Sequence, residues 1–129
     1  MGFGYKGDTG HHHTLGENAA SLKSSFKFNP KSGYFGDKGK SKDNAKRNIA
    51  SDDPVATAKE FYDKATHGGI EKKLDNGKGL KTEMKDGTII TFREISNSDG
   101  SPAVDIKIES SNANGGIASQ RIHFVKKGN

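Results

Sequence analysis

Three segments in the second half of the chain alternate between apolar and polar residues, at positions 87–95, 103–109 and 121–125. Successive residues of a β-strand point to opposite sides of a sheet, so a period of two gives each segment one side to bury and one to expose. The apolar side carries Ile90, Phe92, Val104, Ile106, Ile108, Ile122 and Phe124. The polar side carries Thr91, Arg93, Asp105, Lys107, Glu109, Arg121 and His123. We therefore expect three strands of one sheet, whose polar side is the candidate active surface.

A helix is predicted ahead of these strands. Residues 51–54 read Ser-Asp-Asp-Pro, which combines capping side chains with a proline in the first turn. Apolar residues then recur every three or four positions as far as Ala65, and this spacing indicates one buried helical face. Gly68 and Gly69 end the pattern, because glycine readily adopts the left-handed conformation common after a helix. We expect this helix, from Pro54 to about Thr66, to pack on the apolar side of the sheet.

Turn residues predict how the strands are connected. Residues 80–84 are a plausible first strand, and residues 85–87 form a hairpin turn into the strand at 87–95. Stretches rich in Ser, Asn and Gly at 96–102 and 110–116 predict loops, and residues 117–125 are the last strand. The expected fold class is α+β, with an N-terminal arm and helix on one face of a four-stranded antiparallel meander. The other face is open, and residues 1–129 form a single domain.

The first 50 residues are predicted to be a basic arm. They hold nine Lys or Arg against four Asp or Glu, whereas residues 51–129 hold twelve of each, so the net charge of +5 lies in the arm. This favours a polyanionic partner, either nucleic acid or an acidic protein; a solvated Lys-rich surface is the alternative. Residues 17–25 could make a short helix. Aromatic rings among lysines suit RNA binding, or else they pin the arm to the core. These rings are Phe3, Tyr5, Phe26, Phe28, Tyr34 and Phe35.

Composition excludes several kinds of site. The chain has no Cys, so neither disulfides nor thiolate metal sites are possible. No apolar run approaches the roughly 20 residues that span a membrane, and no signal-peptide pattern is present. Phosphate-binding loops of the Walker type, dinucleotide fingerprints and a serine nucleophile elbow are also missing from the sequence. We expect no cofactor, no metal site and no stable membrane insertion.

His123 has the surroundings best suited to catalysis. It lies in a strand on the polar side, two residues after Arg121, and neighbouring strands should bring Arg93 and Asp105 to the same side. Imidazole titrates near neutrality, and Arg both binds phosphate and offsets the charge of a phosphorane. These groups suffice for metal-independent RNA cleavage, in which a 2′-hydroxyl attacks the adjacent phosphate. The alternative is an ordinary polar sheet surface crossed by salt bridges.

The other histidines have weaker claims. His11, His12 and His13 are consecutive, so in an extended chain they cannot all face one metal ion. His67 ends the predicted helix, where the helix dipole favours a cationic imidazole. We count it, together with Lys81 and Lys107, among the candidate RNA contacts.

Five short motifs form a set. They are Gly-Gly-Ile-Glu-Lys at 68–72, Asn-Gly-Lys-Gly at 76–79, Asp-Gly-Thr-Ile-Ile-Thr-Phe-Arg at 86–93, Ser-Asp-Gly-Ser-Pro-Ala-Val-Asp-Ile at 98–106 and Arg-Ile-His-Phe-Val at 121–125. Together they resemble the C-terminal toxin domains of bacterial polymorphic toxins, the effectors of contact-dependent growth inhibition and related systems. The resemblance covers about residues 50–129. It implies a nuclease that ends a large secreted protein, acts in the target-cell cytoplasm and is neutralised by a cognate immunity protein.

The predicted helix and meander are also similar to the barnase, EndoU, colicin and RelE superfamily of small ribonucleases. That resemblance implies a metal-free active site on the open face of the sheet. The matching positions here are Thr91, Arg93, Arg121 and His123, with Ser96 or Ser98 in the adjoining loop. Asp105 falls on the same face, although a carboxylate is not universal in that superfamily.

The leading hypothesis is therefore a secreted antibacterial ribonuclease toxin that cleaves tRNA, with His123 and Arg93 at its centre. Its partners are the RNA, the immunity protein and, as a further candidate, a cofactor protein of the target cell. One alternative is a non-catalytic module whose basic arm binds RNA or an acidic protein. Another is a metal-dependent DNase toxin, for which Glu94, Asp105 and Glu109 are a thin set of carboxylates.

Overall fold

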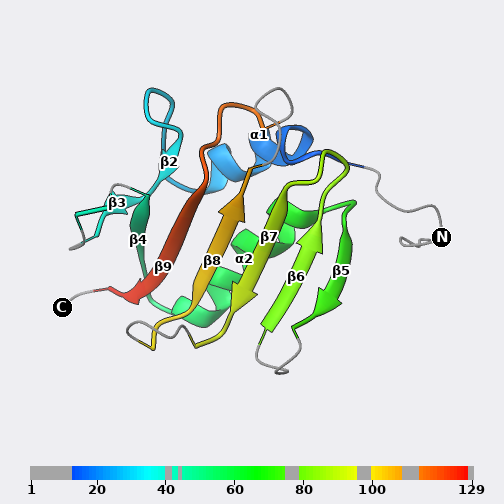
Figure 1. The fold of residues 1–129 in the computed structure, drawn as a ribbon. Coiled ribbons are helices and arrows are strands. Elements are labelled where there is room, and N and C mark those ends of the chain that lie inside the picture. Colours follow the sequence, from blue (N-terminus) through cyan, green and yellow to red (C-terminus); the bar gives the residue numbers. More distant parts are fainter. Residues whose placement is uncertain are drawn as a thin grey trace.

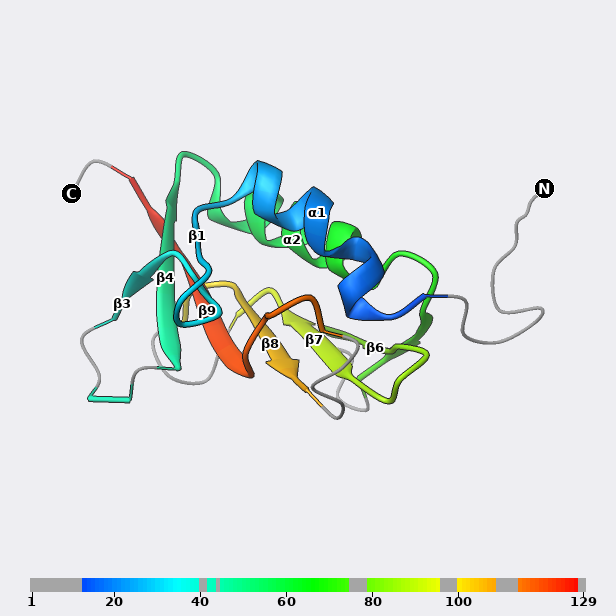
Figure 2. The same ribbon diagram turned by 90° about the horizontal axis from the view of Figure 1, so that it is seen from above.

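Two helices cover one face of a seven-stranded β-sheet (Figure 1). Both helices lie on the same side of the sheet when it is viewed along its edge (Figure 2). The computed structural model of the protein describes residues 13–39, 42–43, 45–74, 79–95, 100–108 and 114–127. Within these residues, neither helix is long and apolar enough to cross a membrane.

The large sheet has the strand order β3-β4-β9-β8-β7-β6-β5. All neighbouring strands are antiparallel except β4 and β9, which are parallel. A separate two-stranded sheet pairs β1 (Phe28–Asn29) with β2 (Tyr34–Phe35). The large sheet consists of β3 (Asp37–Lys38), β4 (Lys46–Ser51), β5 (Ile70–Lys73), β6 (Gly79–Glu83), β7 (Ile89–Arg93), β8 (Ala103–Lys107) and β9 (Gln120–Lys126).

The predicted α+β class is confirmed, but the sheet is larger than the four strands expected. Strands β7 to β9 lie in the three segments that alternate, and β6 lies in the segment predicted as the first strand. Strands β3 and β4 come from the arm, and β5 follows the second helix. These three lack a readable pattern: β3 has two residues, three of the four residues of β5 are charged, and Ile49 is the single large apolar residue of β4. Strands near a sheet edge bury little, so their sequences need not alternate.

Helix α2 spans Pro54–Thr66, as predicted. The Asp53 carboxylate accepts a hydrogen bond from the backbone N–H of Ala56, which satisfies a donor that the helix start leaves open. Gly68 follows the helix with a φ of 82°, a value that glycine adopts without strain. The buried side chains of α2 are Ala58, Phe61, Tyr62, Ala65 and Thr66.

Aromatic side chains hold α2 on the apolar face of the sheet. The rings of Phe61 and Phe124 have centroids 5.8 Å apart, and so do those of Tyr62 and Phe92. Ile90 of β7 is fully buried in the same core. The alternation of the strands therefore identified the buried face correctly.

The described part of the arm is folded onto this core, where it forms a helix and the strands β1 to β4. Helix α1 (Leu15–Ser25) begins two residues before the predicted start, with a capping box between Thr14 and Glu17. The hydrogen bond from the Thr14 backbone lowers the pKa of the Glu17 carboxyl. Asn18 is buried, and its amide donates to the carbonyls of Ala65 and His67, each at 2.9 Å. Those bonds satisfy carbonyls at the end of α2 and join the two helices.

Three aromatic rings of the arm belong to the core. Phe35 is fully buried, and its ring stands edge-on to Phe61 with centroids 5.0 Å apart. Phe26 and Phe28 pack against the same cluster. Pinning of the arm, the second of the two explanations, accounts for Phe35, because a fully buried ring cannot stack on a base. Phe3 and Tyr5 lie outside the described residues.

A buried hydroxyl pair under α2 gives a test of this packing. The Tyr62 and Thr82 hydroxyls are hydrogen-bonded inside the core, and burial raises the pKa of Tyr62, which keeps its hydroxyl protonated. We expect Tyr62→Phe to lower the free energy of unfolding by about 1–3 kcal/mol, because the Thr82 hydroxyl is left without this partner. The double variant Tyr62→Phe/Thr82→Val should recover much of the loss. Urea unfolding of the four proteins measures both effects; additive losses would contradict the coupling.

Candidate functional site

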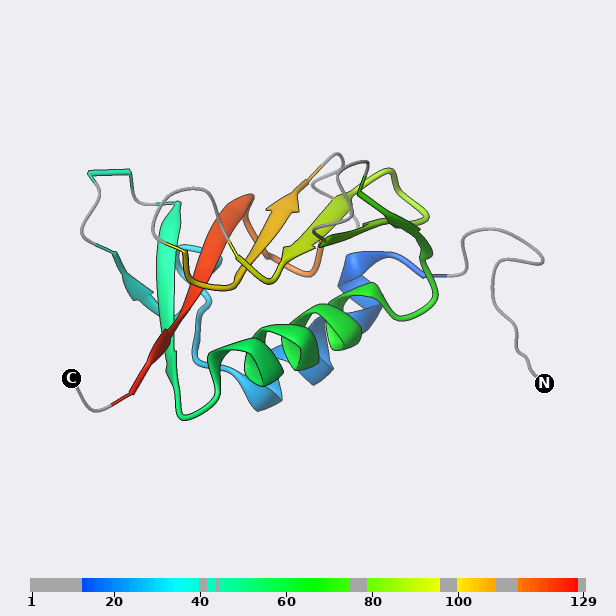
Figure 3. The ribbon, with the colours of Figure 1, turned by 90° about the horizontal axis from the view of Figure 1, so that it is seen from below.

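Both helices lie on one side of the sheet in the view from below (Figure 3). The opposite face carries most of the predicted site residues. Strand pairing places six of its residues in one line across six strands. We call this line the cross-strand row, and in spatial order it consists of Lys46, Arg121, Asp105, Thr91, Lys81 and Lys72. Neighbouring strands are about 4.8 Å apart, so the row is about 24 Å long.

Cations dominate this face. Strands β4 to β9 place six Lys or Arg on it and two carboxylates. The cations are Lys46, Lys72, Lys81, Arg93, Lys107 and Arg121, and the carboxylates are Asp105 and Glu83. All four lysines are exposed to solvent. An excess of exposed positive charge on one face attracts polyanions.

His123 lies in a second line of residues, next to the cross-strand row on the same face of the sheet. It is less accessible to solvent than the sequence indicated. It is paired with Ala103, which is paired in turn with Arg93, so His123 and Arg93 are about 10 Å apart at the backbone. His123 is only 7% exposed and Ala103 only 2%. The expectation of a fully open polar face was therefore wrong at this point. The hydroxyl of Ser101 lies 2.9 Å from Nδ1 of His123.

Asp105 forms an ion pair with Arg121. Its Oδ1 accepts a hydrogen bond from Nε of Arg121 at 2.6 Å. Among the described contacts of His123, the Ser101 hydroxyl lies at Nδ1. The Arg121 and Asp105 side chains are 42% and 27% exposed, so water screens their attraction.

The other predicted site residues divide into three groups. Thr91 and Arg93 are half-buried on the same face, where Lys81 and Lys107 are exposed. His67 belongs to the helical layer, on the other side of the sheet, with its ring centroid 5.0 Å from that of His13. The structure therefore does not bring His67 together with Arg93. Ser96 and Ser98 lie outside the described residues, as do Glu109, His11 and His12.

Four residues of this face were missed from the sequence. Lys46 and Asn48 reach it because β4 pairs with β9, where Asn48 is opposite His123. Lys72 reaches it through β5. Ser101 was assigned to a turn, and its hydroxyl proves to contact the imidazole. No local pattern could have identified the first three, since their strands show no alternation.

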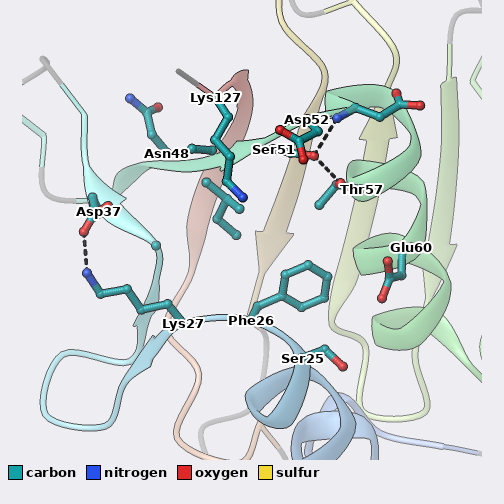
Figure 4. A pocket seen from close by; sticks show the side chains of 14 residues that line it. Ser25, Phe26, Lys27, Asp37, Asn48, Ser51, Asp52, Thr57, Glu60 and Lys127 are labelled. Carbon is teal, nitrogen blue, oxygen red and sulfur yellow. Dashed lines mark hydrogen bonds and ion pairs between the residues drawn. The ribbon is translucent and has the colours of Figure 1, made fainter. Parts of the chain in front are cut away.

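A cavity of about 610 Å³ opens at the edge of β4, away from the cross-strand row (Figure 4). It lies between the end of α1, the start of α2 and the part of β4 that β3 leaves unpaired. The Ser51 hydroxyl bonds that of Thr57 and accepts from the Asp53 N–H. Its wall also holds an exposed ion pair between Lys27 and Asp37, 2.7 Å apart. The other charged groups of its lining are Asp52, Asp53, Glu60 and Lys127, so four carboxylates stand against two lysines.

The exposure of the Asp105–Arg121 ion pair predicts a small coupling free energy between the two residues. A double-mutant cycle with Asp105→Asn and Arg121→Gln should give a coupling free energy of about 0.2–1 kcal/mol at low salt, because both groups are partly exposed. The coupling should shrink at 1 M salt, where screening acts over about 3 Å. Chemical denaturation with urea, which adds no ions, measures it. A coupling of several kcal/mol that salt does not change would contradict this description.

No group of three or more His, Asp or Glu within the described ranges could hold a metal ion. Comparisons of the chain with protein-family models, with curated proteins and with solved structures found no match.

Proposed function

We propose that this chain is an antibacterial ribonuclease toxin that cleaves tRNA without a metal ion. The observation that carries the proposal is the cationic face, where six Lys or Arg gather beside the Thr91 hydroxyl and the His123 imidazole. Basic side chains bind the phosphates of an RNA backbone, and the net charge of +5 acts in the same direction. Neither described helix covers this face (Figure 3).

In this proposal His123 is the base. It takes the proton of a 2′-hydroxyl, whose oxygen then attacks the adjacent phosphorus. The bond to the 5′-oxygen of the next nucleotide breaks, which leaves a 2′,3′-cyclic phosphate and a 5′-hydroxyl that takes up a proton from water. Arg121 and Arg93 offset the charge on the phosphorane, and Thr91 donates a hydrogen bond to a phosphate oxygen. The Ser101 hydroxyl, 2.9 Å from Nδ1, helps to hold the ring in position.

The resemblance to polymorphic toxin domains supplies the biological part of the proposal. The chain would be delivered as the last part of a secreted effector and would act in the cytoplasm of the target cell. A cognate immunity protein would inhibit it there, and a host cofactor protein is a further candidate partner.

The burial of His123 favours a second candidate, a non-catalytic module that binds RNA. An imidazole that is 7% exposed has little access to substrate, whereas the lysines of the same face are exposed. Binding through those lysines requires no proton transfer. A cleavage assay therefore separates the two candidates.

Cleavage of total tRNA in EDTA tests the proposed ribonuclease activity. We expect the purified chain to produce fragments that end in a 2′,3′-cyclic phosphate. His123→Gln should lower the rate about 10²–10⁴-fold, the usual contribution of a general base. Arg93→Gln should also slow cleavage, since it removes charge stabilisation from the phosphorane. Gel analysis of the fragments gives the rates.

Controls make this result interpretable. Lys64→Gln removes a cation from α2, in the helical layer, and should cleave as fast as the unchanged chain. A circular dichroism spectrum must show that His123→Gln is folded, because the replaced ring is buried. Intact tRNA at enzyme excess, both with and without extract of target cells, would rule out the ribonuclease. Cleavage only with Mg²⁺ would indicate the metal-dependent alternative.

A further inference from the structure

We propose that the cross-strand row is the path of one RNA strand, which runs across the β-strands from Lys46 on β4 to Lys72 on β5. RNA as the ligand rests on the proposed function. The path itself depends on binding alone, so it can hold or fail whether or not the chain cleaves RNA.

The arrangement of charge along the row supports a continuous path. Lys46 and Arg121 stand side by side at one end, and Lys81 and Lys72 at the other. Asp105 and Thr91 lie between them. The three lysines are exposed, and the Arg121 side chain is 42% exposed. Each of the six strands therefore contributes a charged or hydroxyl side chain to one accessible line.

The parallel lines on this face are interrupted. The line through His123 continues into Ala103 and, beyond Arg93, into Gly79, neither of which can contact phosphate through a side chain. The next line on the opposite side of the cross-strand row is interrupted by two apolar residues, Ile89 and Ile70. Only the cross-strand row therefore carries suitable side chains on all six strands from β4 to β9.

The width and length of the cross-strand row fit a single strand of RNA. The row is one residue wide, whereas a duplex presents phosphates on two backbones. A stacked strand has a phosphate about every 3.4 Å, so the row of about 24 Å spans about seven phosphates. A stretched strand would place fewer phosphates on it. The sheet twists from strand to strand, which curves the path without breaking it.

Asp105 tunes the affinity of the row. Its carboxylate holds Arg121 at 2.6 Å, so a phosphate that binds Arg121 must compete with it. Asp105 is also the single negative charge within the row. Removing that charge while keeping the shape of the side chain should strengthen binding, an effect opposite to that of removing a lysine.

The experiment uses the full chain and fluorescent 2′-O-methyl oligouridylates of 4, 8 and 12 nucleotides. The methyl group blocks attack by the 2′-oxygen, so the ligand stays intact even if the chain is a ribonuclease. Fluorescence anisotropy at several salt concentrations measures the affinity. We expect a large gain from 4 to 8 nucleotides and a small one from 8 to 12, with a 12-base-pair duplex at least tenfold weaker. The plot of log K against log salt should have a slope of about −3, since four cations each contribute about −0.7.

Single substitutions test the path. Lys46→Gln and Lys72→Gln, at opposite ends, should each reduce the slope by about 0.7 and weaken binding about fivefold at 0.1 M salt. Asp105→Asn should bind more tightly than the unchanged chain. Lys64→Gln on α2 is the matched control and should change neither slope nor affinity.

Three results would overturn the inference. The first is unchanged binding in both Lys46→Gln and Lys72→Gln. The second is equal affinity for the duplex and the single strand. The third is binding of polyglutamate without binding of any oligonucleotide, which would assign the row to an acidic protein. Failure to cleave tRNA, in contrast, would contradict the proposed ribonuclease activity but not the proposed path of the RNA strand.

Discussion

The parallel pairing of β4 with β9 is the contact on which both the arm and the candidate site depend. Six residues of β4 pair in register with six of β9. At the start of β9 the buried side chain of Gln120 accepts from the Phe35 N–H and donates to the Gly33 carbonyl. Parallel strands need a long connection, and this one includes α2 and strands β5 to β8. The pairing thus joins the first third of the chain to the last strand and completes the cationic face.

Burial explains why the two faces of the sheet differ. The helical side encloses apolar residues such as Ile90, Val104 and Ile122, and the Tyr62 hydroxyl is tolerated there because Thr82 bonds it. Moving a lysine into that core would remove it from water at high cost. Lysines therefore collect on the face that the helices leave uncovered. His123 is the exception: its ring is buried, and the Ser101 hydroxyl lies 2.9 Å from its Nδ1.

Binding and proton transfer would occupy different parts of the same face. Arg121 belongs to the exposed cross-strand row, and His123 follows it two residues along β9, about 7 Å away at the backbone. A phosphate held by Arg121 would thus lie close to the imidazole without displacing the residues that bury it. In the proposed function the row would supply affinity, and the buried position of His123 would limit its access to the substrate.

The sequence by itself determined the elements that depend on near neighbours. Helix α2 was predictable because its cap, its apolar spacing and its terminal glycines lie within a few residues of one another. The turn at 85–87 was predictable for the same reason: the Asp86 carboxylate bonds the Thr88 N–H, and Gly87 adopts a φ of 91°. Alternation also identified the apolar side chains of β7, β8 and β9 that face the helices, such as Ile90, Val104 and Ile122.

Only the tertiary structure decided the rest. Residues 46–51 and 121–126 are far apart in the chain, and a segment whose one large apolar residue is Ile49 carries no signal for its partner. Lys46 and Asn48 were therefore missing from the predicted site, and no strand was predicted in the arm. The partner of Asp105 and the burial of His123 depend on which strands and loops pack beside them. Hydrogen bonds across a sheet are made by the backbone of any residue, so pairing over such distances follows from the packing of the whole chain.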